Sequence, residues 1–140
     1  MTIHILGFAY KPKDVGVSEG YIRQTIRTLS VKPRKVEDDL LLHGWKGPPY
    51  HSNWSWRRRE SISELIPIRV TNRGFYYLSD DGNQDRMLGV LIGVSLWECP
   101  NADRVAFRDG IVPPTGLELK KVLKHYAGWK RSARMDIIRW

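Results

Sequence analysis

The sequence predicts an α+β fold, in which a small β-barrel carries two short C-terminal helices. Three observations lead to this class. Short segments rich in β-branched and aromatic residues alternate with turns along most of the chain. Helix start and stop signals are confined to the part after residue 100. The 140 residues are enough to bury one hydrophobic core, and no repeat or linker divides them, so we expect a single domain over residues 1–140.

The predicted strands are apolar or alternating segments separated by polar turns. They span residues 2–8, 21–29, 40–43, 65–71, 75–78, 88–97 and 137–140. The sequence Asp-Asp-Gly-Asn at 80–83 predicts a hairpin turn, because Asp-Gly favours the tight turns that join antiparallel strands. Residues 11–20 contain Pro12, Gly16 and Gly20 and are expected to form a loop.

The two helices are predicted from their capping residues. Asn101 can cap a short helix through residue 107, with Gly110 just beyond its end. Thr115 followed by Glu118 forms a capping-box pattern, and apolar residues at helical spacing follow it. Gly128 is expected to end this second helix.

Composition excludes several classes of protein. A single cysteine, Cys99, rules out an internal disulfide framework and a four-cysteine zinc site. The four histidines show no metal-ligand spacing, so we expect no metal and no cofactor. The longest apolar runs are far shorter than the roughly 20 residues that span a bilayer, so we expect a cytoplasmic protein without a membrane partner. The net charge of +8 favours a polyanion, most commonly a nucleic acid.

Residues 44–60 are predicted to form a Trp/Arg-rich loop insertion, because glycines and prolines precede the tryptophans. Aromatic rings can stack on single-stranded bases while arginine neutralises phosphate, which indicates a nucleic-acid surface. The candidate residues are Lys32, Arg34, Lys35, Lys46, Tyr50, Trp54, Trp56, Arg57, Arg58 and Arg59. The alternative is that Trp54 and Trp56, two positions apart, point into the core from one strand face while the arginines are solvated.

Three segments together resemble the ASCH family, a branch of the PUA-like β-barrels. Residues 20–27, G-Y-I-R-Q-T-I-R, resemble the family's G-x-K-x-x-T-x-R segment. Residues 36–41 resemble its Gly-Asp turn into an apolar strand, with Asp38 where glycine is usual. In the tail, an acidic residue, Asp109, precedes a helix and a closing strand, an order similar to small stand-alone ASCH proteins.

The resemblance implies binding of RNA, single-stranded nucleic acid or a modified nucleoside in a cleft containing Thr25, Arg27, Asp109 and Ile22. Some small members hydrolyse N4-acetylcytidine with a Lys, a Thr and an acidic residue, which would make Thr25 and Asp109 catalytic here. The lysine position falls on Ile22, which cannot accept a proton. This difference favours binding over hydrolysis, unless Lys11 or Lys13 reaches the cleft from the preceding segment.

Three functions therefore remain open: a nucleic-acid or nucleoside binding module, an amidohydrolase acting on N4-acylated cytidine, and a protein-docking factor of a phage or mobile element. Thr25 and Arg27 also have a purely structural interpretation, as strand residues with an ordinary salt bridge to Asp39 or Asp109.

Overall fold

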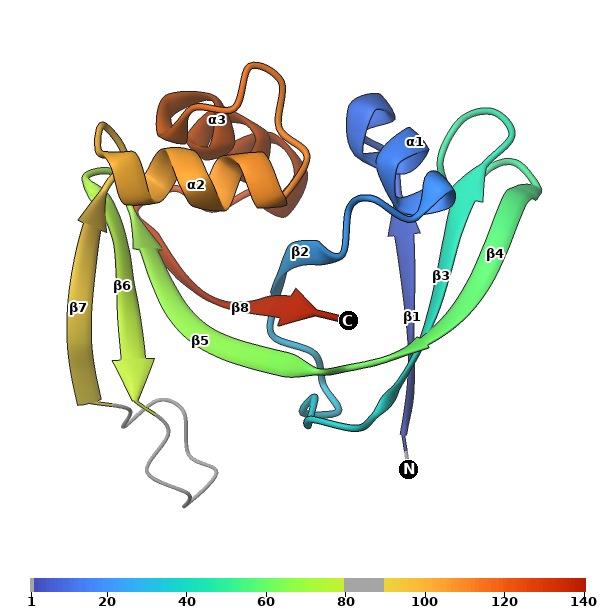
Figure 1. Ribbon diagram of the computed structural model, residues 1–140, viewed down its shortest axis with the longest axis horizontal. Helices are drawn as coiled ribbons and strands as arrows, with labels where there is room; N and C mark the ends of the chain where they lie inside the picture. The colour runs from blue at the N-terminus through green and yellow to red at the C-terminus, as the bar shows by residue number, and fades with distance from the viewer. Residues whose placement is uncertain (1, 80–89) are drawn as a thin grey trace.

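The computed structural model describes residues 2–79 and 90–140, and the expected turn at 80–83 lies outside this part of the chain (Figure 1). The elements in chain order are β1 (Ile3–Phe8), α1 (Lys11–Glu19), β2 (Gln24–Thr28), β3 (Asp39–Trp45), β4 (Trp54–Ser61), β5 (Glu64–Thr71), β6 (Gly74–Ser79), β7 (Val90–Leu96), α2 (Pro100–Arg108), α3 (Gly116–Ala127) and β8 (Ser132–Arg139). None of the described helices is both long and apolar enough to cross a membrane.

The strands form two sheets. The smaller has the order β1-β3-β4 and the larger the order β2-β8-β5-β6-β7. Only the β1–β3 pair is parallel, and all other pairs of the described strands are antiparallel. β4 runs on into β5 as one strongly curved ribbon that passes from the smaller sheet to the larger (Figure 1). The α+β class is thus confirmed, whereas the hydrogen-bonded pairs of the described strands do not close the sheets into a barrel.

Two groups of buried apolar side chains form the core. The first lies between the five-stranded sheet and helices α2 and α3, and includes Phe75, Leu119 and Met135. The second lies between the three-stranded sheet, α1 and the end of β8, and includes Leu40 and Trp140. Helix α1 and helix α2 therefore belong to different sides of the molecule (Figure 1).

The prediction of a loop over residues 11–20 was wrong, because this segment is helix α1. Pro12 lies in the first helical turn, where a missing N–H removes no internal hydrogen bond. Gly20 ends the helix with φ +91°, a conformation that favours glycine. Gly16 lies inside the helix. This position requires glycine, because a Cβ there would collide with Cδ1 of Ile22. The glycines thus mark close packing and a helix end, and the described part of the chain has a third helix in addition to the two expected.

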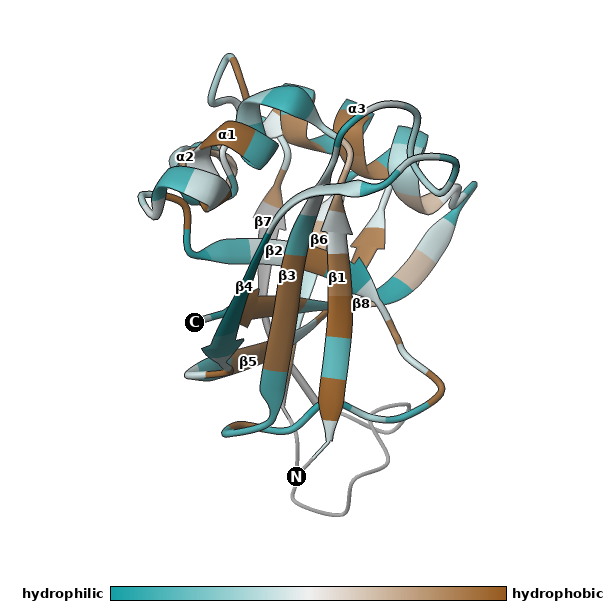
Figure 2. Cartoon of the chain, turned by 90° about the vertical axis from the view of Figure 1, so that its right-hand side faces the viewer, coloured by the Kyte–Doolittle hydropathy of each residue, from teal (hydrophilic) through white to brown (hydrophobic). Residues whose placement is uncertain are grey.

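The prediction of a loop as far as residue 60 was also wrong in its second half, because Trp54–Ser61 is strand β4. It pairs with β3 in the register Leu42 with Arg58, and its side chains alternate between half-buried and exposed. Figure 2 shows β4 hydrophilic along most of its length, whereas β3 and β1 carry hydrophobic residues. The irregular part of the expected insertion is the connection between β3 and β4.

The C-terminal helices follow their predicted signals closely. Thr115 caps α3 by accepting a hydrogen bond from the Glu118 N–H at 3.2 Å, and Gly128 ends the helix with φ +69°. Helix α2 begins two residues earlier than expected, because the Cys99 sulfur accepts a hydrogen bond from the Ala102 N–H. Asn101 is therefore inside the first turn rather than at the cap.

Candidate functional site: a pocket with a buried Lys–Asp pair

A pocket of about 420 Å³ lies between α1, β2 and α3. Its lining comes from the end of β1, the start of α1, strand β2, the C-terminal half of α3, the end of α2, and Pro49 and Tyr50 of the β3–β4 connection. We call it the site pocket. Its volume is within the range typical of small-molecule sites, about 300–1,000 Å³.

The site pocket contains an ion pair between Lys13 of α1 and Asp109 at the C-terminal end of α2. The Lys13 Nζ lies 2.8 Å from Asp109 Oδ2, and the two residues are only 7% and 2% exposed. Burial lowers the pKa of Lys13 and raises the pKa of Asp109, while each partner's charge opposes the shift of the other. Burial therefore disfavours the charged form of both groups, and their mutual attraction offsets that cost.

Gln24 of β2 holds the other oxygen of Asp109. Its Nε2 donates to Asp109 Oδ1 at 3.3 Å and to the Val105 carbonyl at 3.3 Å. Its Oε1 accepts a hydrogen bond from Arg139 Nε at 3.0 Å. The carboxylate plane of Asp109 is thus fixed by Lys13 on one oxygen and by Gln24 on the other.

Thr25 and Arg27 also line the site pocket, on strand β2. Arg27 Nε donates to Thr25 Oγ1 at 3.2 Å, and its Nη2 donates to the Gly7 carbonyl at 2.6 Å. The guanidinium lies 4.9 Å from the ring centre of Phe8. Burial lowers the pKa of Arg27 to about 10, so it remains a cation at neutral pH. Because Thr25 accepts from Arg27, its own hydroxyl proton is left for another acceptor.

Aromatic side chains complete the lining of the site pocket. Tyr10 and Tyr126 face each other edge to face, with ring centres 6.4 Å apart. Tyr50 is 84% exposed and lies 5.2 Å from the ring of Trp45. The site pocket therefore combines polar side chains with aromatic rings, and the exposed ring of Tyr50 can contact a ligand.

The structure brings together three of the four residues expected in the cleft. Thr25, Arg27 and Asp109 all line the site pocket, but Ile22 does not. Ile22 is buried against Gly16 and Gly110 and lines a second pocket, between α1 and α2, instead. The structural interpretation expected a salt bridge from Arg27 to Asp39 or Asp109. Arg27 instead donates hydrogen bonds to Thr25 and the Gly7 carbonyl. Asp39 pairs with Arg59, and Asp109 pairs with Lys13.

Of the two lysines considered from the sequence, Lys13 enters the site pocket and Lys11 is exposed. Because helix α1 begins at Lys11, the side chain of Lys13 points toward Asp109. The signal that could have identified Lys13 was the helix itself, which the sequence interpretation missed. The site thus has a lysine, but on a different element from the position occupied by Ile22.

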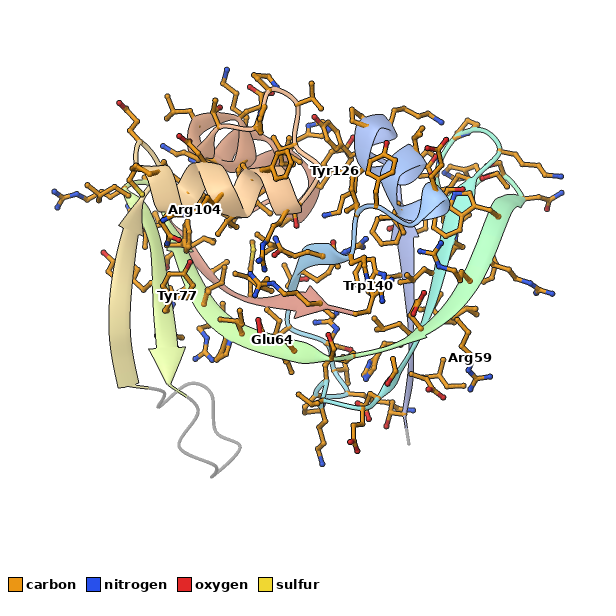
Figure 3. All side chains as sticks on the ribbon, in the orientation of Figure 1. Arg59, Glu64, Tyr77, Arg104, Tyr126 and Trp140 are labelled. Carbon is orange, nitrogen blue, oxygen red and sulfur yellow. The ribbon has the colours of Figure 1, made fainter. Side chains whose placement is uncertain are left out.

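Apart from Arg34, the predicted nucleic-acid residues divide into two groups. The exposed group consists of Lys32, Lys35, Lys46, Tyr50, Arg57 and Arg59. Figure 3 shows Arg59 pointing away from the sheet, although it pairs with Asp39 at 2.7 Å. Arg34 was wrongly expected on this surface, because it is buried and donates to the Thr28 carbonyl at 2.9 Å.

Trp54, Trp56 and Arg58 form the second group, on the half-buried face of β4. Trp54 stacks on His43 with ring centres 4.0 Å apart, and Trp56 donates its indole N–H to Asp14 at 2.7 Å. Arg58 donates to the Val17 and Ser18 carbonyls at the end of α1. Trp54 and Trp56 thus lie on the inner face of β4, as the alternative expected, but Arg58 does not follow it, because it is half-buried beside them rather than solvated.

Comparisons with protein-family models, with curated proteins and with solved structures found no significant match to this chain. Within residues 2–79 and 90–140, no group of His, Cys, Asp or Glu side chains is arranged to hold a metal ion. The function proposed below therefore depends on the geometry of the site itself.

Proposed function

We propose that the protein is a nucleoside-binding module of the PUA-like, ASCH type, and that the site pocket holds a cytosine-type base, free as a modified nucleoside or within RNA. One observation carries the proposal: Thr25, Arg27 and Asp109 line the same pocket, as the family resemblance implies. The curved ribbon of β4 and β5, which joins the two sheets, supports a PUA-like architecture.

The polar groups of the site pocket suit a base that carries an exocyclic amine. A carboxylate has about four acceptor positions, of which Lys13 and Gln24 occupy two. The remaining positions of Asp109 can accept an amine N–H, while the Thr25 hydroxyl can donate to a ring or carbonyl acceptor. Arg27 supplies a cation with unused N–H donors for a phosphate or carbonyl oxygen. The aromatic lining offers a face for stacking.

The surface charge supports RNA as the carrier of such a base. The exposed cations of the predicted nucleic-acid surface, Lys32, Lys35, Lys46 and Arg57, are free to contact phosphates. Tyr50 belongs to both the site pocket and this exposed group, so the two are adjacent at that residue.

Calorimetric titration with cytidine 5′-monophosphate, N4-acetylcytidine and a short single-stranded RNA tests the proposal. We expect binding that Arg27→Gln weakens at least tenfold, whereas Arg104→Gln, the same change at an exposed position outside both the site pocket and the predicted nucleic-acid surface, leaves binding unchanged. For the RNA, affinity should fall as salt rises. The proposal is refuted if none of the three ligands binds at low salt, or if the two arginine variants behave alike.

A second function, hydrolysis of an acylated amine on the base, is favoured by the position of Lys13. The position that resembles the family's lysine holds Ile22, but Lys13 reaches Asp109 in the pocket that contains Thr25. Burial lowers the pKa of Lys13, which increases the neutral fraction able to accept a proton.

In this mechanism, neutral Lys13 takes the Thr25 hydroxyl proton while the oxygen attacks the acyl carbon. The C–N bond then breaks, the amine leaves with the proton returned by Lys13, and water hydrolyses the acyl–Thr25 ester. Chromatography of N4-acetylcytidine after incubation with the protein measures the reaction. We expect Thr25→Val to abolish deacetylation, while binding is weakened only by the loss of the one hydrogen bond that the Thr25 hydroxyl donates. Binding without turnover in the unaltered protein would exclude this second function and leave the binding proposal intact.

A further inference from the structure

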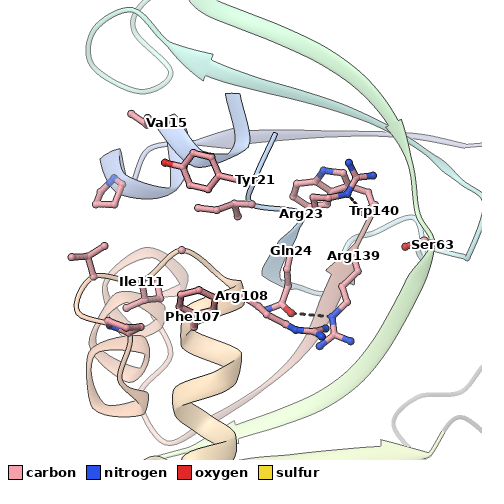
Figure 4. A pocket seen from close by; sticks show the side chains of 15 residues that line it. Val15, Tyr21, Arg23, Gln24, Ser63, Phe107, Arg108, Ile111, Arg139 and Trp140 are labelled. Carbon is pink, nitrogen blue, oxygen red and sulfur yellow. Dashed lines mark hydrogen bonds between the residues drawn. The ribbon is translucent and has the colours of Figure 1, made fainter. Parts of the chain in front are cut away.

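A second and larger pocket, of about 850 Å³, lies between α1 and α2. We call it the α1–α2 groove. Figure 4 shows Val15 and Tyr21 on one side of it and Phe107 and Ile111 on the other. Gln24 lines the groove and bonds to Asp109, so these two side chains separate it from the site pocket. The nucleoside proposal makes no use of this groove.

The rim of the α1–α2 groove exposes large apolar side chains. Tyr21 is 66% exposed, Phe107 is 72% exposed and Val112 is 61% exposed. Exposed apolar side chains gathered around one concave surface, rather than scattered singly, are typical of an interaction site. Small-molecule sites usually enclose most of the ligand's surface, whereas this groove is open and has exposed apolar residues at its rim, which suits a peptide better.

The charge of the α1–α2 groove is entirely positive. Arg23, Arg108 and Arg139 line it, and none of its lining residues, all in the described part of the chain, is acidic. Arg139 pairs with Glu64, but Arg23 and Arg108 have no carboxylate partner among the described residues. The indole N–H of Trp140, another lining residue, is buried and has no hydrogen-bond partner in that part of the chain. The lining of the groove therefore offers cations, but no carboxylate to attract another cation.

We propose that the α1–α2 groove binds a peptide segment of a partner protein, which inserts an aromatic or aliphatic side chain between Tyr21 and Phe107 and places carboxylates against Arg23 and Arg108. The apolar lining supplies the affinity of such a contact, and the arginines supply selection for acidic flanking residues. This partner site is independent of the nucleoside proposal.

A second copy of the chain is a poorer occupant on electrostatic grounds. In a two-fold contact the same patch faces itself, so the arginines of one copy would meet those of the other. Each copy also carries a net charge of +8. An acidic segment is complementary to the α1–α2 groove where a second copy is repulsive.

Selection from a phage-displayed library of 12-residue peptides tests the proposal against partners of any sequence. We expect the selected peptides to share an aromatic or large aliphatic residue flanked by Asp or Glu. Their affinity, measured by fluorescence anisotropy of the synthetic peptides, should fall at least tenfold with Arg108→Glu and with Phe107→Ser. Both altered side chains are exposed, so the fold should be retained. Arg131→Glu, the same charge change at an exposed position outside the groove, should have no effect.

The proposal is overturned if the library yields no binding peptides, if the selected peptides lack acidic residues, or if Arg108→Glu and Arg131→Glu weaken them equally. A dimer in sedimentation that Phe107→Ser converts to a monomer would assign the groove to a second copy. Loss of single-stranded RNA binding on Arg108→Glu, with peptide binding unchanged, would assign it to nucleic acid.

Discussion

Removing either partner of the Lys13–Asp109 pair should destabilise the protein, with opposite pH dependence for the two partners. Lys13→Met leaves a buried carboxylate without its cation, and Asp109→Asn leaves a buried ammonium without its anion. A buried charge stripped of its partner typically costs about 3–5 kcal/mol. Small domains unfold with a free energy of about 5–15 kcal/mol, so each single change should remove a large share of the stability.

The magnitude can be read from urea unfolding followed by tryptophan fluorescence. With a urea dependence of about 2 kcal/mol/M, a loss of about 3–5 kcal/mol moves the unfolding midpoint down by about 2 M. The double variant Lys13→Met/Asp109→Leu removes both charges and leaves no orphan. It should be much more stable than the sum of the single losses predicts.

The two single variants differ in the sign of their pH dependence. In Asp109→Asn, burial lowers the pKa of Lys13 and no anion opposes the shift. The unfolded chain then binds more protons than the folded chain, so the stability of this variant relative to the parent rises with pH toward about pH 10. In Lys13→Met, the pKa of Asp109 is raised by burial, so the folded chain binds more protons and relative stability rises as the pH falls toward about 4. Two variants with the same slope, or a Lys13→Met variant as stable as the parent, would refute the buried pair.

Three further changes test separate contacts. Gly110→Ala forces a side chain into a φ of +77° and places its Cβ against Cδ1 of Ile22. In thermal unfolding, this change should lower the unfolding free energy by about 1–3 kcal/mol. Adding Ile22→Val, which removes Cδ1, should recover part of the loss. Burial raises the pKa of Asp38, but hydrogen bonds from His4 and the Lys35 N–H outweigh burial, so the net pKa is lowered. The stability that the Asp38 carboxylate contributes is therefore lost as the pH falls below 3.8. In Asp38→Asn, the free energy of unfolding should depend less on pH in that range. Trp56→Phe removes the indole hydrogen bond to α1 and should cost about 0.5–1.5 kcal/mol in urea unfolding, whereas unchanged stability would show that this bond is not formed.

Most strands and the C-terminal helices could be predicted because their signals are local, whereas β4 was predicted as a loop because glycines and prolines precede it. Alternating apolar residues identify β5, and the Thr115 cap with Gly128 identifies α3. Helix α1 could not, because its proline and glycines are also the residues of a loop. Only the tertiary contact of Gly16 with Ile22 explains why glycine is required inside that helix.

The expectation that Thr25, Arg27 and Asp109 share one cleft came from the resemblance alone, and the three residues do line one pocket. Asp109 is far from Thr25 and Arg27 in the sequence, and no periodicity places the three together. The position of Lys13 follows from the direction of α1, and a loop over the same residues gives its side chain no defined direction. The direction of Trp54 and Trp56 was left open by the sequence, because a two-residue spacing fits both an exposed stacking face and a buried strand face.

The amide of Gln24 can take only one orientation. Its Nε2 faces the Asp109 carboxylate and its Oε1 faces the Arg139 guanidinium, so turning it over would set oxygen against oxygen and N–H against N–H. One neutral side chain thus has a carboxylate on one side and a guanidinium on the other. A ligand that draws Arg139 into the α1–α2 groove would release the Oε1 end of this amide, and with it one of the two bonds that orient Asp109. The Gln24 amide is therefore a hydrogen-bonded link between a side chain of the site pocket and a side chain of the α1–α2 groove.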